Sequence, residues 1–323
     1  MSKTMKIWFI IAAFLVVFGF IIFVVVMAVF DFYDLGFTKL NTMKYGTNTY
    51  EVNEAFDKIS INVDTTQIEF VPSDDESCTI VCFETEKMKH SATVQNKTLI
   101  IDMIDTRKWY DYIGISIGSP KMTVYLPQNE YVSLFVDTHT GDIVIPKDFT
   151  FETLKINEST ADVECLASVL NGIEIKLSTG NTKIDGVSAS EIHLVSTTGK
   201  ININSVSSKG NIEIETSTGA VHLTDVVCTD FSAKSNTGTI VLKNVVASNC
   251  FFIENKIGDV RFENSDAAQI SVKTSTGDVT GTLLSEKVFI AETSTGSIRV
   301  PKTITGGKCE ITTSTGDIKI DIK

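Results

Sequence analysis

The stretch IEIETSTGAVHL, residues 212–223, decides the fold of this chain. Apolar and polar residues alternate on both sides of the Thr-Gly pair at positions 218 and 219. Alternation with a period of two predicts two short strands, each with one buried and one solvent-facing side. The Thr-Gly pair predicts a tight turn between them. Segments of this kind recur every 19 or 20 residues from residue 134 to residue 323.

A glycine marks the turn of each repeat, except that Ala161 stands in the second turn. The turn glycines are Gly141, Gly180, Gly199, Gly219, Gly238, Gly258, Gly277, Gly296 and Gly316. Glycine readily adopts the left-handed or tight backbone that such a corner requires. A fixed period this short is typical of stacked supersecondary units.

Four positions of each repeat are expected to face the interior: seven and five residues before the turn glycine, and two and four residues after it. Thirty-eight of these forty residues are apolar, whereas the 43% hydrophobic content of the chain would give about 17. A unit of 19 residues cannot enclose a core alone, so neighbouring turns must share one. The sequence therefore predicts an all-β protein, a single-stranded β-solenoid (β-helix) of 19–20-residue coils over residues 131–323. A β-sandwich of hairpins would need more variable spacing.

The region before the repeats is less regular. Residues 59–130 contain strand-like stretches with longer connections, and Ile59, Ile61 and Ile68 repeat the inward pattern around a Thr-Thr pair. We expect an N-terminal irregular β cap at 59–130 that shields the first coil, preceded by a juxtamembrane spacer at 31–58. The last strand, Asp317–Lys323, is expected to leave the other end of the stack open for pairing.

Residues 7–30 form an uncharged apolar run of 24 residues, interrupted only by Gly19. As a helix the run would extend roughly 36 Å, enough to cross a bilayer core. A cleaved signal peptide would have a shorter apolar region and a small-residue cleavage site. We therefore expect an uncleaved transmembrane helix. Lys3 and Lys6 precede it, which favours a cytoplasmic tail at residues 1–6 and an extracytoplasmic solenoid in the cell membrane.

The net charge and the spacing of the cysteines limit the kinds of partner and site that the chain can have. A net charge of −12 argues against nucleic acid, since phosphate binding needs a basic patch. The six cysteines show no metal-binding spacing and no readable disulfide framework. Cys82, Cys165 and Cys309 are expected to be buried as small apolar residues, and Cys228 and Cys250 to lie in loops.

Two groups of residues are candidate contacts for a ligand or partner. Trp109, Tyr110 and Tyr112 form the densest aromatic cluster outside the apolar run, and rings beside charges can stack on a sugar or anchor a protein. The alternative is a cap loop that folds over the end of the solenoid. Phe252 and Ile290 are predicted to point outward in one register two coils apart, as a small contact patch or as isolated exposed side chains.

Aspartate follows the turn residue in five repeats, at Asp142, Asp162, Asp259, Asp278 and Asp317. Neighbouring coils would place such carboxylates about 5 Å apart, so Asp259 and Asp278 could act on a glycoside or hold calcium. They could equally be solvated turn residues that the repeat aligns. The four histidines share no register. We therefore predict no catalytic residue, no metal and no cofactor.

The turn sequences TSTGDV at 274–279, TSTGDI at 313–318 and TSTGAV at 216–221 resemble those of a bacterial putative-adhesin family, a domain of unknown function with β-strand repeats. The resemblance covers residues 59–323, and it departs from the pattern at Ala161 and at residues 255–258. It implies a membrane-anchored protein of the cell envelope and carries over no catalytic residues.

The leading functional hypothesis is a membrane-anchored cell-envelope β-solenoid. It would serve as an adhesin-like scaffold that binds or displays a glycan or protein at the cell surface, without catalytic activity. The alternative is an envelope-stress sensor or scaffold that partners a membrane signalling system. A more remote alternative is a glycan-active enzyme.

Overall fold

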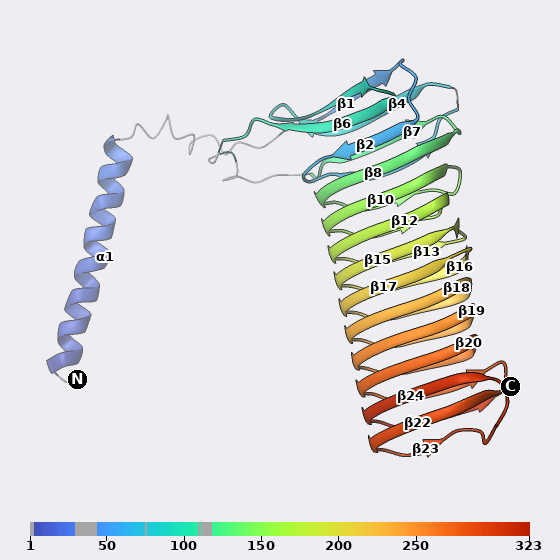
Figure 1. Cartoon of the computed structure of the whole chain (residues 1–323). Coiled ribbons are helices and arrows are strands. Elements are labelled where there is room, and N and C mark those ends of the chain that lie inside the picture. Colours follow the sequence, from blue (N-terminus) through green and yellow to red (C-terminus); the bar gives the residue numbers. More distant parts are fainter. Residues whose placement is uncertain (1–2, 30–43, 75, 109–110, 112–117) are drawn as a thin grey trace. The chain divides into compact units, whose positions relative to one another are not determined.

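A computed structural model of the protein describes residues 3–29, 44–74, 76–108, 111 and 118–323 (Figure 1). Within these residues the chain contains one helix, α1 (Lys3–Val29), and 25 strands. The first strands are β1 (Tyr45–Val52), β2 (Lys58–Asn62), β3 (Gln67–Pro72), β4 (Cys78–Thr85), β5 (Met88–Gln95), β6 (Thr98–Asp105) and β7 (Lys121–Leu126). The repeats begin with β8 (Glu130–Thr140), β9 (Ile143–Ile145), β10 (Thr150–Thr160), β11 (Val163–Cys165), β12 (Ser168–Thr179), β13 (Thr182–Asp185), β14 (Ser188–Ala189), β15 (Glu191–Thr198) and β16 (Ile201–Ser208). They continue with β17 (Asn211–Thr218), β18 (Val221–Thr237), β19 (Ile240–Ile257), β20 (Val260–Thr276), β21 (Val279–Leu283), β22 (Lys287–Thr295), β23 (Ile298–Arg299), β24 (Gly307–Thr315) and β25 (Ile318–Ile322).

Helix α1 confirms the helix expected from the apolar run. Its segment Ile7–Val25 has a mean hydropathy of 3.1 and is the one helix in the described part of the chain that is long and apolar enough to cross a membrane. None of that segment is buried inside the protein. Residue 30 lies outside the described residues.

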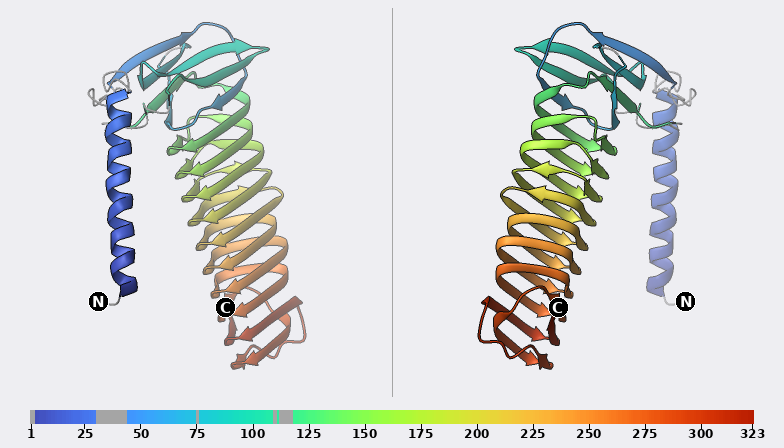
Figure 2. Two further views of the ribbon diagram at one scale, coloured as in Figure 1. Left: turned by 90° about the vertical axis from the view of Figure 1, so that its left-hand side faces the viewer. Right: turned by 90° about the vertical axis from the view of Figure 1, so that its right-hand side faces the viewer.

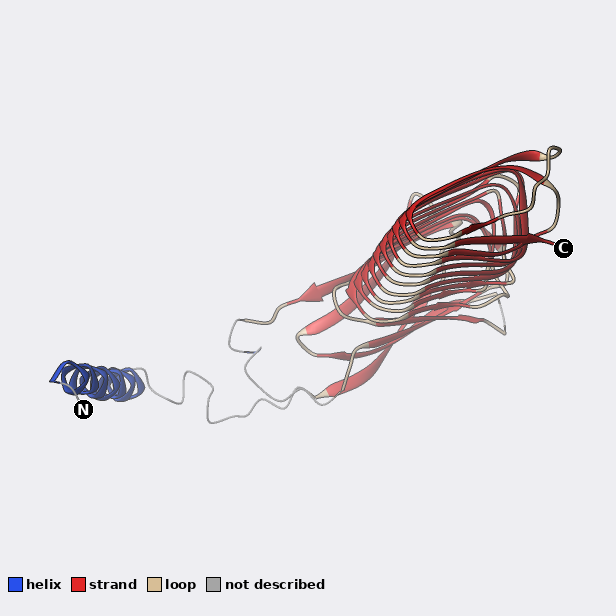
Figure 3. Cartoon of the chain, turned by 90° about the horizontal axis from the view of Figure 1, so that it is seen from below, coloured by secondary structure: helices blue, strands red, loops and turns tan. Residues whose placement is uncertain are grey.

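The repeats form the predicted β-solenoid, of about ten turns. Successive turns pair in parallel and in register, as in Ile192 with Ile212 and Leu194 with Ile214. The same spacing links Ile203 to Leu223 on the strand after the turn. The views in Figure 2 show the turns stacked one above another, and Figure 3, which looks along the stack, shows their strands superimposed.

The interior is a set of apolar columns. Ile212, Ile214, Val221 and Leu223, the four inward residues of one turn, are almost completely buried. Their counterparts above and below are buried in the same way, in one continuous cluster. Each such side chain contributes about 1.5–3 kcal/mol by leaving water, so the shared core is what holds the short repeats together.

The turn glycines are required because neighbouring turns approach closely. All nine have a φ angle between 133° and 154°, a region that side-chain-bearing residues rarely adopt. A Cβ atom on Gly238 would lie 1.9 Å from the carbonyl oxygen of Gly219, and one on Gly180 would lie 1.7 Å from that of Ala161. Ala161 is tolerated because its own φ angle is not positive.

Each of several turns has a second corner, six residues after the turn glycine, which the sequence analysis did not predict. The residues at this corner have φ angles between 50° and 68°: Gly186, Ser205, Asp225, Asn244 and Asn264. Glycine, asparagine and aspartate at this position were the available signal, since they accept this conformation most easily. The segment expected to be a return loop is strand in β18, β19 and β20, which run 17 or 18 residues each. Cys228 and Cys250 accordingly lie in β18 and β19, not in loops.

The stack begins earlier than its first recognisable repeat. Strand β2 pairs in register with β8, and β3 with β9, so Ile59 lies on Leu134 and Ile68 on Ile143. On the opposite side, β6 pairs with β2 and β7 with β3. Strand β4 then joins the edge of β7 in antiparallel. Strand β1 lies within the range 31–58 that was expected to be a spacer.

The last turns are not stacked in sequence order. Strand β20 pairs with β24, and β24 pairs with β22. Likewise β21 pairs with β25, and β25 with β23. The expectation that Asp317–Lys323 forms the open end is therefore wrong. That segment is enclosed between two turns, and the outermost turn is β22 with β23 (Figure 1). Because the enclosed turn has a paired turn on each side, its inward residues Ile311 and Ile318 are fully buried.

Candidate functional site

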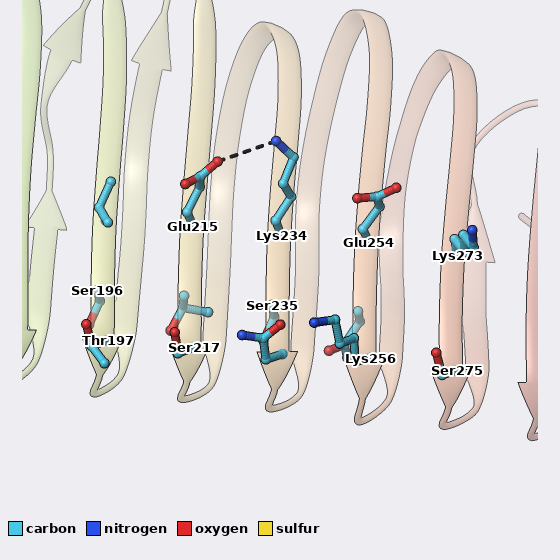
Figure 4. A pocket seen from close by; sticks show the side chains of 14 residues that line it. Ser196, Thr197, Glu215, Ser217, Lys234, Ser235, Glu254, Lys256, Lys273 and Ser275 are labelled. Carbon is cyan, nitrogen blue, oxygen red and sulfur yellow. Dashed lines mark hydrogen bonds and ion pairs between the residues drawn. The ribbon is translucent and has the colours of Figure 1, made fainter.

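A groove of about 570 Å³ crosses five successive turns on the outside of the solenoid (Figure 4). It is formed by β15, β17, β18, β19 and β20, just before their turn glycines. We call it the five-turn groove. Its lining residues are Val195, Ser196, Thr197, Glu215, Thr216, Ser217, Lys234, Ser235, Asn236, Glu254, Asn255, Lys256, Lys273 and Ser275.

The strand alternation arranges the outward side chains in rows. One row contains Glu215, Lys234, Glu254 and Lys273, which are paired in register on successive strands. Glutamate and lysine therefore alternate at the coil spacing of about 4.8 Å. Figure 4 shows this row above a second row of hydroxyl and lysine side chains nearer the turn.

The charges of the five-turn groove are accessible. Glu215 and Lys234 form a 3.4 Å ion pair in which both side chains are nearly half exposed, and such pairs contribute little to stability. The groove has three lysines and two glutamates, in a chain with a net charge of −12. The lining therefore has a small net positive charge, whereas the protein as a whole is acidic.

The residues between the rows face the interior, so the groove has a rigid floor. Ser196, Thr216, Ser235 and Asn255 are buried beneath it. The side-chain amide of Asn255 donates to the carbonyl oxygens of Gly238 and Gly258, both at 2.9 Å. A polar ligand could be held by hydrogen bonds from the exposed ammonium and hydroxyl groups.

A second hollow, of about 780 Å³, lies in the cap and is lined by Glu54, Asp74 and Glu76 among other residues. No lysine, arginine or histidine is among its lining residues. Acidic side chains on an open surface are ordinary, and nothing in the hollow brings their oxygens together. The five-turn groove is the better candidate because its groups are ordered by strand register.

Phe252 and Ile290 both point outward as predicted, with exposed fractions of 38% and 44%. The predicted spacing of two coils is wrong, because they lie three turns apart. Phe252 pairs with Ser271, Ser271 with Glu310, and Glu310 with Ile290. Two polar residues therefore separate them, because the enclosed last turn lies between their turns. Trp109, Tyr110 and Tyr112 lie outside the described residues.

The aspartates after the turns form a ladder of hydrogen bonds. The Oδ1 atom of Asp259 accepts the backbone N–H of Asp278 at 2.9 Å, and that of Asp278 accepts the N–H of Asp317 at 2.7 Å. Asp142 receives the N–H of Asp162 in the same way, at 3.0 Å. Each carboxylate thus binds an amide of the next turn, and this accounts for its position without a reacting sugar or a calcium ion.

Cys82, Glu84 and His90 bring three possible metal ligands within 4.8 Å of one another, all buried in the cap. The carboxylate of Glu84 is already saturated. Oε1 accepts from Asn48 Nδ2 at 2.6 Å and from Tyr50 OH at 2.7 Å. Oε2 accepts from the backbone N–H of His90 and lies 2.7 Å from its Nδ1.

A metal ion would have to displace these donors, so the residues do not fit a metal site. Burial alone would raise the pKa of the Glu84 carboxyl, but the hydrogen bonds from Tyr50, Asn48 and His90 hold it below its ordinary value. The sequence analysis did not predict this cluster, whose members lie on β4 and β5 and whose donors Asn48 and Tyr50 lie on β1.

All six cysteines are free, and five of them are buried. Burial raises the pKa of the Cys165 and Cys309 thiols to about 12. The thiol of Cys250 is partly exposed and lies 2.9 Å from an oxygen of Asp230, and its pKa is about 11. These thiols stay protonated at neutral pH, which makes them poor nucleophiles and poor metal ligands.

A family model, Toastrack DUF4097, matches residues 56–222 and 209–323. The chain belongs to this family. The Toastrack match begins close to β2 and extends to the last residue, so it covers the whole stack described above. No curated protein matches the chain.

Solved structures with a similar fold include two putative adhesins and a putative lipid binding protein. The crystal structure of a putative adhesin from Parabacteroides merdae aligns with a TM-score of 0.51 and 12% identity, over 75% of this chain and 97% of that one. That of a putative lipid binding protein from Parabacteroides distasonis aligns with a TM-score of 0.48 and 14% identity, over 87% and 99%. A putative adhesin from Bacteroides fragilis gives 0.43 and 14%, over 86% and 97%. At such identities the likeness concerns the fold alone.

Proposed function

We propose that this Toastrack protein is an adhesin-like scaffold of the cell envelope, anchored by α1, which binds a surface glycan or protein segment in the five-turn groove. The observation that carries the proposal is the groove itself. Five consecutive strands present accessible charged and hydroxyl groups in fixed register. Because a shared core holds the strands, the ligand would meet a surface already ordered for binding.

The apolar helix α1 and the Toastrack family support the proposed location in the cell envelope. Segment Ile7–Val25 is long enough to hold the chain in a membrane, with the solenoid on the outer side as the lysines before it favour. The engagement of Asp259 and Asp278 with backbone amides supports a binding role over catalysis.

A binding screen with groove variants tests this proposal. The full chain, purified in detergent micelles, is applied to an array of bacterial and host glycans and to surface-protein extracts with identification of the captured species. Lys234→Glu with Lys273→Glu reverses two groove charges and should weaken any captured ligand at least tenfold. Lys243→Glu is the matched control, since Lys243 is an exposed lysine of β19 outside the groove lining.

Each outcome separates the hypotheses. Binding that is lost in the groove variant and kept in the control supports the scaffold. Binding that is equal in both variants excludes the groove as its site. Capture of a membrane kinase or its regulator, unaffected by the groove charges, would favour the sensor alternative. Hydrolysis of an array glycan would favour an enzyme.

A further inference from the structure

We propose that the outer end of the stack is a self-association surface, which binds the same surface of a second copy of this chain. This end surface consists of β22, β23 and residues 300–306. The inference is independent of the five-turn groove, which lies on other turns.

The end surface has an unpaired strand edge. In the described part of the chain, β22 pairs only with β24, and β23 pairs only with β25. Every earlier turn from β10 to β20 has a partner on both sides, as β19 has in β18 and β20. Edge strands with free N–H and C=O groups are ready to pair with another chain.

The end surface also exposes apolar side chains, beside the charged residues Glu292, Arg299 and Lys302. Phe289 and Val300, at inward positions, are only partly buried because no further turn covers them. Ile298 has an exposed fraction of 45%, whereas its register partner Ile318 in the enclosed turn has 0%. Ile304, on the loop beside them, is 92% exposed. Phe289, Ile298 and Val300 occupy the inward positions that every turn presents to its neighbour.

Local contacts hold the end surface in shape. The ammonium group of Lys287 is buried and lies 2.7 Å from Asp266, which ties the outermost turn to β20. The consecutive glycines Gly306 and Gly307 let the chain return between the turns. A Cβ atom on Gly307 would lie 1.7 Å from the carbonyl oxygen of Ala268. A surface that is rigid before association loses little entropy on binding.

The best complement for this surface is another copy of it. A two-fold pairing of end surfaces would set the two copies of β22 antiparallel, unlike the parallel pairs within the stack, and would bring the exposed apolar residues of one copy against those of the other. Head-to-tail stacking of two copies is blocked, because at the opposite end of the stack β2 and β3 already pair with β6 and β7. A two-fold pairing of end surfaces uses up both edges, so it yields a dimer and not a filament.

The test measures the mass of the full chain in detergent micelles by light scattering, over a wide range of concentrations. The wild-type protein should be a dimer that dissociates on dilution. Ile290→Lys with Ile298→Lys places charges on the end surface and should weaken the dimer at least 100-fold. Ile304→Asp, on the exposed loop, should weaken it without touching a strand. Val227→Lys is the matched control, because Val227 is an apolar residue of β18 with 56% exposure far along the stack, and it should leave the dimer unchanged.

Three results would overturn the proposal: a monomer at every concentration, a dimer that persists in the end-surface variants, or wild-type association beyond a dimer. Persistence would locate the contact elsewhere, including α1. Melting curves of all variants show whether a lost dimer reflects a lost fold. If Ile290→Lys with Ile298→Lys does not fold, Ile304→Asp decides the question.

Discussion

Two buried glutamates show how neighbouring groups set the state of a carboxyl. Glu84 accepts four hydrogen bonds and stays ionised. In Glu158 only Oε1 is paired, with the backbone N–H groups of Ser159 and Thr160, while Oε2 has no partner. Burial therefore raises the pKa of the Glu158 carboxyl to about 7. It occupies the same inward position as Thr138 in the turn before.

Glu158 should make the solenoid less stable as the pH rises. Its pKa in the folded state lies above the unfolded value of 4.5, so the folded state holds the proton more tightly. Stability is greatest below about pH 4.5 for this group and falls as the pH passes through about 7. Glu158→Gln should remove this fall and stabilise the protein by about 2 kcal/mol at pH 8.

Urea unfolding at a series of pH values measures the effect. Glu164→Gln serves as the control, since Glu164 is outward-facing and pairs with Lys183 at the surface. The raised pKa of Glu158 would be contradicted if the free energy of unfolding of the wild-type protein, relative to that of Glu158→Gln, did not fall between about pH 4.5 and pH 8.

At the scale of the strand, the inward position three residues before the turn glycine forms a polar ladder inside an apolar core. Most of its hydroxyl and amide groups lack a partner for at least one atom: Ser196, Thr216, Ser235, Asn255 and Thr274. In the enclosed last turn, the hydroxyl at the same position has a partner, because Thr313 Oγ1 donates to the carbonyl oxygen of Gly277 at 3.2 Å. A buried hydroxyl without a partner costs stability, whereas a paired one contributes.

The same substitution should therefore have opposite effects at two rungs of this ladder. Thr216→Val removes an unpaired hydroxyl and should stabilise the protein by about 1 kcal/mol, while Thr313→Val breaks a hydrogen bond and should destabilise it by about 1 kcal/mol. Both residues are buried and β-branched, so each variant controls for the other. Chemical unfolding of both proteins checks the difference, and equal shifts in one direction would show that pairing does not decide the outcome.

At the scale of the whole molecule, the order of the last turns changes what truncation does. The segment after residue 306 forms an interior turn, so its removal leaves β22 and β23 without the strands that they pair with. Removal of everything after residue 284 takes away both turns and leaves β20 and β21 as an ordinary end.

The longer deletion should therefore give the better-folded protein. We expect the chain ending at residue 306 to be cut by proteases between residues 285 and 306, and to melt at a lower temperature than the chain ending at residue 284. Limited proteolysis with mass spectrometry locates the cuts. Resistance of residues 285–306 in the shorter deletion would mean that the outermost turn can move inward to pair with β20.

The repeating architecture was readable from the sequence because its causes are local. Alternation along residues 212–223, the glycine at 219 and the 19- or 20-residue period each act within one turn, and together they determined the strands, the first corner and the inward columns. The second corner, at Asp225 and Asn244, has an equally local cause in the residue type at that position, although it was not predicted. The aromatic candidates at 109–112 remain predictions.

Only the tertiary structure decided which turns are neighbours at the end of the stack, which side chains line the groove, and that Asn48 and Tyr50 of β1 donate to Glu84 of β4. The physical reason is that all turns present nearly the same apolar columns. Phe289 and Cys309 both match the register of Ile270, so either turn could follow β20 by pattern alone. The chosen order depends on the free energy of the complete assembly, to which the return at Gly307 and the ion pair of Lys287 with Asp266 contribute.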